Sequence, residues 1–156
     1  MSISFRTTLA VLMIGGALVT AAAAPGKASG RPAAEADFVG TWITWWDEDG
    51  EPSTCARMVV IAEGPGALDG MWAAPGWNGL LYGRVEQTRR GLRWQGQWRD
   101  ESSTGGFRFV LGVPGSPPDR FEGVYTNAGS SEELTWNGAR MVEGDIPEVP
   151  CTFREG

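Results

Sequence analysis

The sequence predicts an all-β domain, an eight-stranded antiparallel up-and-down barrel, from three observations. First, a motif of an apolar residue, any residue, Gly, any residue and usually a large apolar residue recurs six times after residue 37. Second, apolar and polar residues alternate around the motif with the period of a half-buried strand. Third, the connections are short and rich in Gly, Pro, Asn and Ser, which leaves no room for crossover helices.

The N-terminal residues 1–23 are expected to be a secretory signal peptide. Arg6 precedes an apolar stretch from Leu9 to Val19, and small residues suited to cleavage after Ala23 follow it. The alternative, an uncleaved anchor helix, is disfavoured because a membrane span needs about 20 apolar residues. We therefore expect export to the periplasm or the extracellular space, with no membrane span after processing.

Residues 24–36 are expected to be a flexible leader, because Pro, Ala and Gly dominate them and large apolar side chains are missing. The barrel domain is then expected to cover residues 37–141. In its clearest strand, Leu92, Trp94 and Trp98 share one face with Gly96, while Arg and Gln occupy the other. The expected strands are 38–46, 56–63, 67–73, 80–86, 92–99, 106–112, 120–126 and 133–141.

Consecutive antiparallel strands with one polar face form a meander, and closing the meander into a barrel removes both of its edges. Glycines in the middle of the strands favour closure, because they leave room for neighbouring Trp rings in a tightly coiled barrel. A two-sheet β-sandwich is the alternative fold. The connections expected in this meander include Gly64-Pro65-Gly66, Trp77-Asn78-Gly79 and Arg90-Gly91.

The two cysteines, Cys55 and Cys151, are expected to form a disulfide, because an even pair in an exported protein is usually oxidised. Two buried free thiols are the alternative. A bond to Cys55 requires the tail, residues 142–156, to turn back along the barrel after the last strand. Pro147 and Pro150 favour the extended path that this return needs.

The composition excludes several functional classes. The chain has no His, so nucleophiles activated by imidazole and His-ligated metal or haem sites are not available. With 13 Lys and Arg against 19 Asp and Glu, it offers no basic surface for nucleic acid. We expect no enzymatic activity, no metal site and no cofactor. The acidic run Asp47, Glu48, Asp49 and Glu51 lacks the spacing of an EF-hand, which favours a solvated loop over a Ca²⁺ site.

The up-and-down order places aromatic residues at one end of the barrel. Counting by twos along the inward faces puts these side chains near the end that carries the acidic, Ser-rich loops, and Trp77 lies in one of those loops. Apolar groups of ordinary kinds fill the other end. An aromatic mouth with a polar rim is typical of a small-molecule site. The expected ligand-binding residues are Trp46, Trp72, Trp77, Trp98, Tyr125 and Asn127.

A family resemblance accompanies this pattern. Gly40-Thr41-Trp42, followed by repeated Gly-x-aromatic strands, resembles the avidin and streptavidin group, and Gly-x-Trp on the first strand is also a mark of the lipocalins. These are barrels of the calycin type. The resemblance implies that Trp42 packs beside a cation of the last strand, and Arg140 occupies that position.

The resemblance does not extend to the residues that contact biotin. The avidin group has an Asn and two Ser at three positions that contact biotin, where this chain has Thr44, Glu48 and Ala74. We therefore expect a secreted, noncatalytic protein that binds a small planar or amphipathic molecule other than biotin. The alternative is a structural or protein-interaction module of the cell envelope with a filled barrel. Its partner is another protein or a second copy of the chain, held through outward apolar groups such as Trp45, Val110 and Val124.

Overall fold

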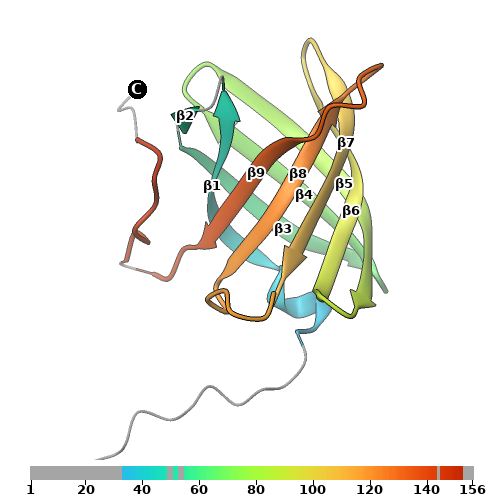
Figure 1. Ribbon diagram of the computed structural model, residues 1–156, viewed down its shortest axis with the longest axis vertical. Helices are drawn as coiled ribbons and strands as arrows, with labels where there is room; N and C mark the ends of the chain where they lie inside the picture. The colour runs from blue at the N-terminus through green and yellow to red at the C-terminus, as the bar shows by residue number, and fades with distance from the viewer. Residues whose placement is uncertain (1–32, 49–50, 53–54, 144, 153–156) are drawn as a thin grey trace, which may run out of the picture. The chain divides into compact units, whose positions relative to one another are not determined.

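Eight long antiparallel strands close into an up-and-down barrel in the computed structural model, which describes residues 33–48, 51–52, 55–143 and 145–152 (Figure 1). Each strand pairs with its neighbour in the sequence, and the first also pairs with the last. The barrel prediction is confirmed, and the sandwich alternative is wrong. The long strands are β1 (Gly40–Glu48), β3 (Ala56–Gly64), β4 (Ala67–Ala74), β5 (Trp77–Thr88), β6 (Gly91–Asp100), β7 (Thr104–Leu111), β8 (Arg120–Asn127) and β9 (Leu134–Arg140).

A short strand that was not expected, β2 (Glu51–Pro52), pairs with the end of β1. The predicted signal peptide and residues 24–32 of the predicted leader lie outside the described residues. Among the residues that the structure describes, no helix is long and apolar enough to span a membrane.

The turn before β5 differs from the prediction. Residues 77–79 belong to the strand, and the turn falls at Pro75-Gly76, where Gly76 has a φ of 80°. Pro followed by a Gly with positive φ is the signature of a type II turn, and here this signal prevails over Asn78-Gly79. Gly79 serves packing instead, because a Cβ there would lie 2.6 Å from the indole of Trp72.

The first strand also begins later than expected, at Gly40. Before it, the 3₁₀ helix η1 (Glu35–Asp37) lies at the lower end of the barrel in Figure 1. The backbone N–H of Gly66, in the β3–β4 turn, donates to Oε2 of Glu35 over 2.8 Å. Phe38 follows the helix and is fully buried in the core. The described end of the predicted leader is therefore part of this lower end, which we call the closed end.

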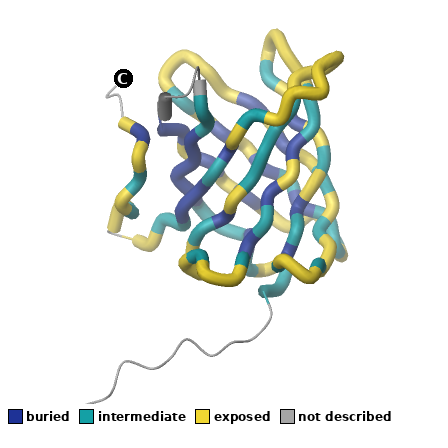
Figure 2. Tube along the Cα trace, in the orientation of Figure 1, coloured by how far each residue is buried: buried dark blue, intermediate teal, exposed yellow. Residues whose placement is uncertain are grey.

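The barrel interior is filled by aromatic and aliphatic side chains from all eight long strands. Burial alternates along the strands, as the blue and yellow bands of Figure 2 show. Trp94 and Phe107 meet edge to face with centroids 4.9 Å apart, and Phe109 stacks on Phe121 at 4.5 Å. These contacts belong to the main core cluster of the barrel.

Two glycines that face each other in the middle of β5 and β6 allow the sheet to coil tightly. Gly83 and Gly96 are register partners. A Cβ on Gly96 would overlap the carbonyl oxygen of Tyr82, and a Cβ on Gly83 would overlap that of Gln95. The recurring motif thus places a residue without a side chain where the backbones of adjacent strands approach most closely.

We expect Gly96→Ala to lower the free energy of unfolding by about 1–3 kcal/mol, because the added methyl group meets backbone atoms that cannot move independently. Urea denaturation followed by tryptophan fluorescence measures the loss. Gly64→Ala is the matched control, since a Cβ there has no neighbour within 4 Å. The control should change stability by less than about 0.5 kcal/mol. Equal effects at the two positions would contradict the account.

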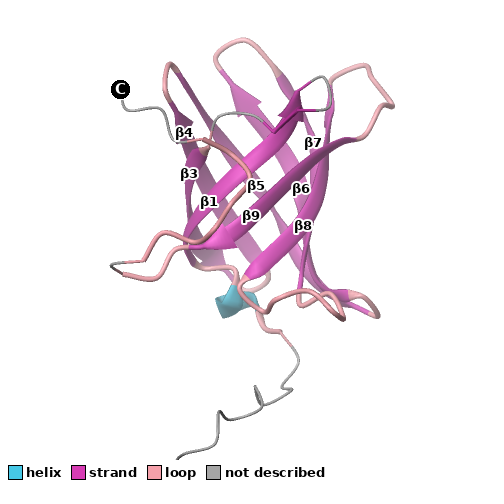
Figure 3. Cartoon of the chain, turned by 60° about the vertical axis from the view of Figure 1, so that its left-hand side comes forward, coloured by secondary structure: helices cyan, strands magenta, loops and turns pink. Residues whose placement is uncertain are grey.

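The C-terminal tail returns along the outside of the barrel, as expected, and is held by the Cys55–Cys151 disulfide (Figure 3). The N–H of Cys55 donates to the carbonyl of Thr152 over 3.1 Å. A second apolar cluster lies under the tail and is separate from the barrel core. It contains Ile43, Trp45, Cys55, Ala139 and Cys151, with Met141 and Val149 packed against them.

Candidate ligand-binding site

A cavity of about 280 Å³ opens at the end of the barrel away from η1, which we call the open end. The cavity lies where β1, β4, β6 and β8 end and where β5 and β9 begin. Its volume is slightly below the roughly 300 Å³ that is the lower bound of typical small-molecule pockets. The residues that line it are Trp46, Trp72, Trp77, Trp98, Asp100, Ser102, Ser103, Tyr125, Asn127 and Trp136.

Three of the indoles that line the cavity form a cluster. Trp46, Trp72 and Trp136 come from β1, β4 and β9, and their ring centroids lie 5.5–5.9 Å apart in edge-to-face pairs. Tyr125 of β8 joins them, with its ring 5.7 Å from Trp136 and 6.0 Å from Trp98. The indole N–H of Trp98 donates to the carbonyl of Thr126. The rings hold one another in place, so the aromatic wall is preorganised.

Two indole N–H groups in this wall are orphaned. The Nε1 atoms of Trp72 and Trp136 are buried without a hydrogen-bond partner among the described residues. Leaving a buried donor unpaired costs about 1–3 kcal/mol. The indole nitrogens that have partners, in Trp42 and Trp98, use backbone carbonyls. The Nε1 atom of Trp94, in the filled core, is also without a partner among the described residues, so this feature does not distinguish the aromatic wall from the rest of the core.

The rim of the cavity is polar and comes from the hairpin loops. Trp77 is 60% exposed at the start of β5. In the β6–β7 loop, Oδ1 of Asp100 accepts hydrogen bonds from the N–H groups of Ser102 and Ser103, over 2.7 and 2.6 Å, and from the Ser102 hydroxyl. This loop geometry fixes the Asp100 carboxylate at the cavity edge.

The described hairpin loops of the open end carry only acidic charges, although Arg99 and Arg57 stand on the adjoining ends of β6 and β3. Residues 74–79, 100–105 and 127–133, which form its described hairpins, contain no Lys or Arg. They hold four carboxylates, of which Glu133 pairs with Arg108 at 3.1 Å. The closed end has charges of both signs, because Arg89 and Arg90 form the β5–β6 turn while Glu35, Asp37, Glu63 and Asp119 lie in or beside η1 and the other turns. The described loops around the mouth are therefore the more uniformly acidic of the two sets.

All six ligand-binding residues predicted from the sequence line this single cavity. The prediction missed Trp136, although the same counting by twos along β9 places it inward, one step from Leu134 at the mouth. It placed the loop of Asp100, Ser102 and Ser103 at this end but did not name these residues as part of the site. Their roles depend on how the β6–β7 loop folds over the opening, and no alternation of residues encodes that fold.

The structural pair predicted from the sequence, a Trp and an Arg, lies at the closed end. Trp42 and Arg140 are register partners in β1 and β9, and the guanidinium carbon lies 4.4 Å from the Trp42 ring centroid. Arg140 donates to the carbonyls of Val39 and Asp37. Burial lowers the pKa of Arg140, and the nearby carboxylates of Asp37 and Asp119 partly oppose this effect. This geometry matches what the family resemblance implies.

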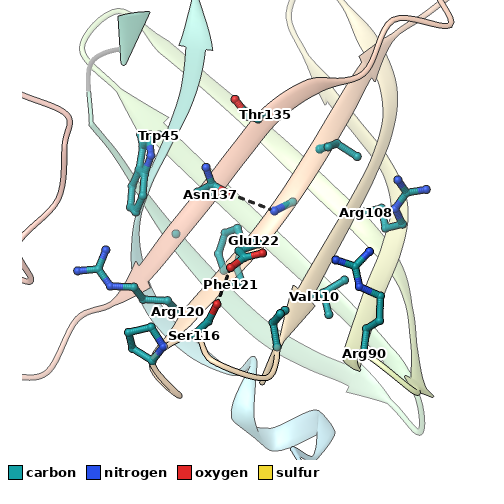
Figure 4. A pocket seen from close by; sticks show the side chains of 15 residues that line it. Trp45, Arg90, Arg108, Val110, Ser116, Arg120, Phe121, Glu122, Thr135 and Asn137 are labelled. Carbon is teal, nitrogen blue, oxygen red and sulfur yellow. Dashed lines mark hydrogen bonds between the residues drawn. The ribbon is translucent and has the colours of Figure 1, made fainter. Parts of the chain in front are cut away.

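A larger groove, of about 590 Å³, lies on the outer wall over β7, β8 and β9 (Figure 4). The three outward apolar residues named from the sequence, Trp45, Val110 and Val124, all line it. Trp45 is only 7% exposed because the apolar cluster under the tail includes it. In the groove, the Asn137 side chain accepts a hydrogen bond from the N–H of Gly123 (Figure 4).

The described residues contain no group of three or more Cys, Asp or Glu side chains able to hold a metal ion. In the acidic run considered for Ca²⁺, Asp47 accepts a hydrogen bond from the Thr135 hydroxyl. Asp49 and the side chains of Glu48 and Glu51 lie outside what the structure describes. Among the described residues that line the mouth cavity, Asp100 is the one that carries a carboxylate.

Compared with known proteins, the chain matches no protein-family model and no curated protein sequence.

Proposed function

We propose that this chain is an exported, noncatalytic binding protein that takes a small planar or amphipathic molecule into the aromatic cavity at its open end. The observation that carries the proposal is the convergence of six aromatic rings from separate strands on one open cavity of about 280 Å³. Flat rings pack efficiently against aromatic walls, and the polar rim supplies orientation. Periplasmic or extracellular location follows from the predicted signal peptide.

The ligand is not biotin. Thr44, at the first of the biotin positions of the avidin group, is fully buried and does not line the cavity. Ala74, at another of these positions, supplies no hydroxyl. A site with these residues retains aromatic packing and lacks the hydrogen bonds that would select biotin over other compounds of similar size.

The proposal predicts saturable binding of the neutral dye N-phenyl-α-naphthylamine, with increased dye fluorescence and a change in tryptophan fluorescence. Trp98→Ala and Trp77→Ala should weaken this binding at least about tenfold, because each removes a ring from the cavity. Trp77 is exposed, so its variant keeps the folded barrel even if Trp98→Ala is destabilised. Biotin should form no tight complex in calorimetry.

Tyr82→Ala is the matched control for these variants. Tyr82 is a 42% exposed aromatic residue of β5 that lies outside the mouth cavity. The control should bind the dye as the unchanged protein does. Absence of dye binding, or equal loss in Tyr82→Ala and Trp77→Ala, would contradict the proposed site.

A protein-interaction module remains the second candidate function. It is favoured by the outer groove, because Trp45, Val110 and Val124 gather there from three different strands. Docking of an envelope protein on this wall would leave the mouth free. Val124→Asp would then abolish docking and leave binding of the dye unchanged.

A further inference from the structure

We infer that the ligand of the open-end cavity is an organic cation, an aromatic or alkyl-substituted ammonium, with Asp100 as its counter-ion. This inference rests on the proposed binding function and specifies the chemical class of ligand. Two independent features of the cavity support it, the electrostatics of its lining and the aromatic rings in that lining.

The lining contains a carboxylate and no positively charged side chain among the described residues. The hairpins around it add Glu101 and Glu132, while Arg108 is paired with Glu133 and Arg99, which precedes Asp100, is exposed outside the cavity lining. A cavity whose walls are of low dielectric focuses this negative potential at the opening. An anionic ligand would meet repulsion there, and a cation would be attracted.

The lining that meets this potential is aromatic. Trp46, Trp72 and Trp136 meet edge to face at 65–88°, so each contact uses the edge of one indole and the face of another, and a ligand would meet the ring surfaces that these contacts leave open to the cavity. The face of an indole carries the negative part of its quadrupole, and cages of such rings recognise ammonium groups. This barrel already contains one such contact, Arg140 over Trp42, at its closed end.

Asp100 is positioned to complete the cage. Its Oδ1 accepts the three hydrogen bonds of the β6–β7 loop. In the described part of the chain, Oδ2 has no bonding partner, so it is available to a ligand. The same residue also lines a smaller adjoining hollow of about 200 Å³ beside Trp77 and Glu101. A ligand can therefore place its ammonium at the rim and its apolar part against the buried rings.

The test compares three small ligands of one shape that differ in charge: hydroxyphenyl-trimethylammonium, its neutral isostere tert-butylphenol, and the anionic hydroxybenzenesulfonate. Each is titrated by calorimetry and by displacement of N-phenyl-α-naphthylamine. We expect the cation to bind about tenfold more tightly than the neutral isostere. Its affinity should fall with added salt, while that of the neutral compound should not. The anion should bind weakest.

Asp100→Asn tests the counter-ion. The variant keeps the Oδ1 acceptor of the loop and removes the charge, so the fold is retained. We expect about a fivefold loss of affinity for the cation and less than about a twofold change for the neutral isostere. Glu63→Gln, which removes the same charge from the exposed closed-end part of β3, is the control and should leave both affinities unchanged.

The outcomes separate the two proposals. If the dye and the neutral isostere bind as tightly as the cation, or Asp100→Asn and Glu63→Gln behave alike, the cation inference is wrong and the binding function stands. If neither the dye nor any of the three ligands binds, the binding function fails and the inference fails with it.

Discussion

Trp42→Ala is expected to lower the free energy of unfolding by about 3–5 kcal/mol, because it deletes a fully buried aromatic ring from the core. The loss goes beyond the cavity that the change leaves. The indole N–H of Trp42 donates to the carbonyl of Phe38 over 2.8 Å, and the ring lies under the guanidinium of Arg140. Denaturation by urea, followed by circular dichroism, measures the change.

Two further variants divide this loss into its parts. Trp42→Phe keeps most of the apolar volume and removes the indole hydrogen bond, so it should cost less than Trp42→Ala. Arg140→Met removes the cation and leaves the carbonyls of Val39 and Asp37 without their donor, at a cost of about 1–3 kcal/mol. The Trp42→Ala and Arg140→Met effects should not be additive, because the two side chains touch.

Trp77→Ala provides the matched surface control, since the same substitution at a 60% exposed ring should change stability by less than about 0.5 kcal/mol. If Trp42→Ala left the free energy of unfolding nearly unchanged, the stability of the closed end would not depend on this ring.

The strands were predictable because a strand with one buried and one exposed face alternates apolar and polar residues with a period of two. The strand from Leu92 to Trp98 illustrates this, since each inward position is large and apolar or is a Gly required by the opposite strand. The boundaries were less predictable where two turn signals compete. Pro75-Gly76 and Asn78-Gly79 are both good turns, and the packing of Trp72 on Gly79, its register partner across the hairpin, supports the first through a contact that the turn residues themselves do not encode.

The aromatic part of the candidate site was predictable for the same reason. In an up-and-down barrel, the direction of a strand determines which end of the barrel a residue is near, and its place in the alternation determines whether its side chain points inward. Trp46 and Trp72 are near the ends of strands that run toward the mouth, and they lie 5.5 Å apart. The same topology predicted the acidic, Ser-rich loops at this end, but it did not indicate which of their side chains line the cavity. The position of Asp100 depends on the hydrogen bonds of its loop, and η1 at the closed end is a three-residue turn that has no periodicity to detect.

Replacing both cysteines by Ala is expected to lower the free energy of unfolding by about 4–5 kcal/mol. The bond joins residues 96 positions apart, and closing a loop of about this length restricts the unfolded chain strongly. In the folded protein, the same bond holds Val149 and Cys151 against Ile43 and Trp45 on the outer wall. Reduction of the unchanged protein should produce the same loss as the double variant, which equilibrium denaturation with and without reductant measures.

Val149→Ala distinguishes the two contributions of the tail. This variant weakens the packing of the tail on Trp45 while keeping the bond, so it should cost about 1 kcal/mol or less, well below the loss for the double cysteine variant. Because the barrel strands do not depend on the tail for pairing, the double variant should retain its β-sheet circular dichroism and its binding of N-phenyl-α-naphthylamine at low temperature. Two titratable thiols in protein purified without reductant would refute the disulfide, and loss of the sheet signal on reduction would show that the tail is required for barrel closure.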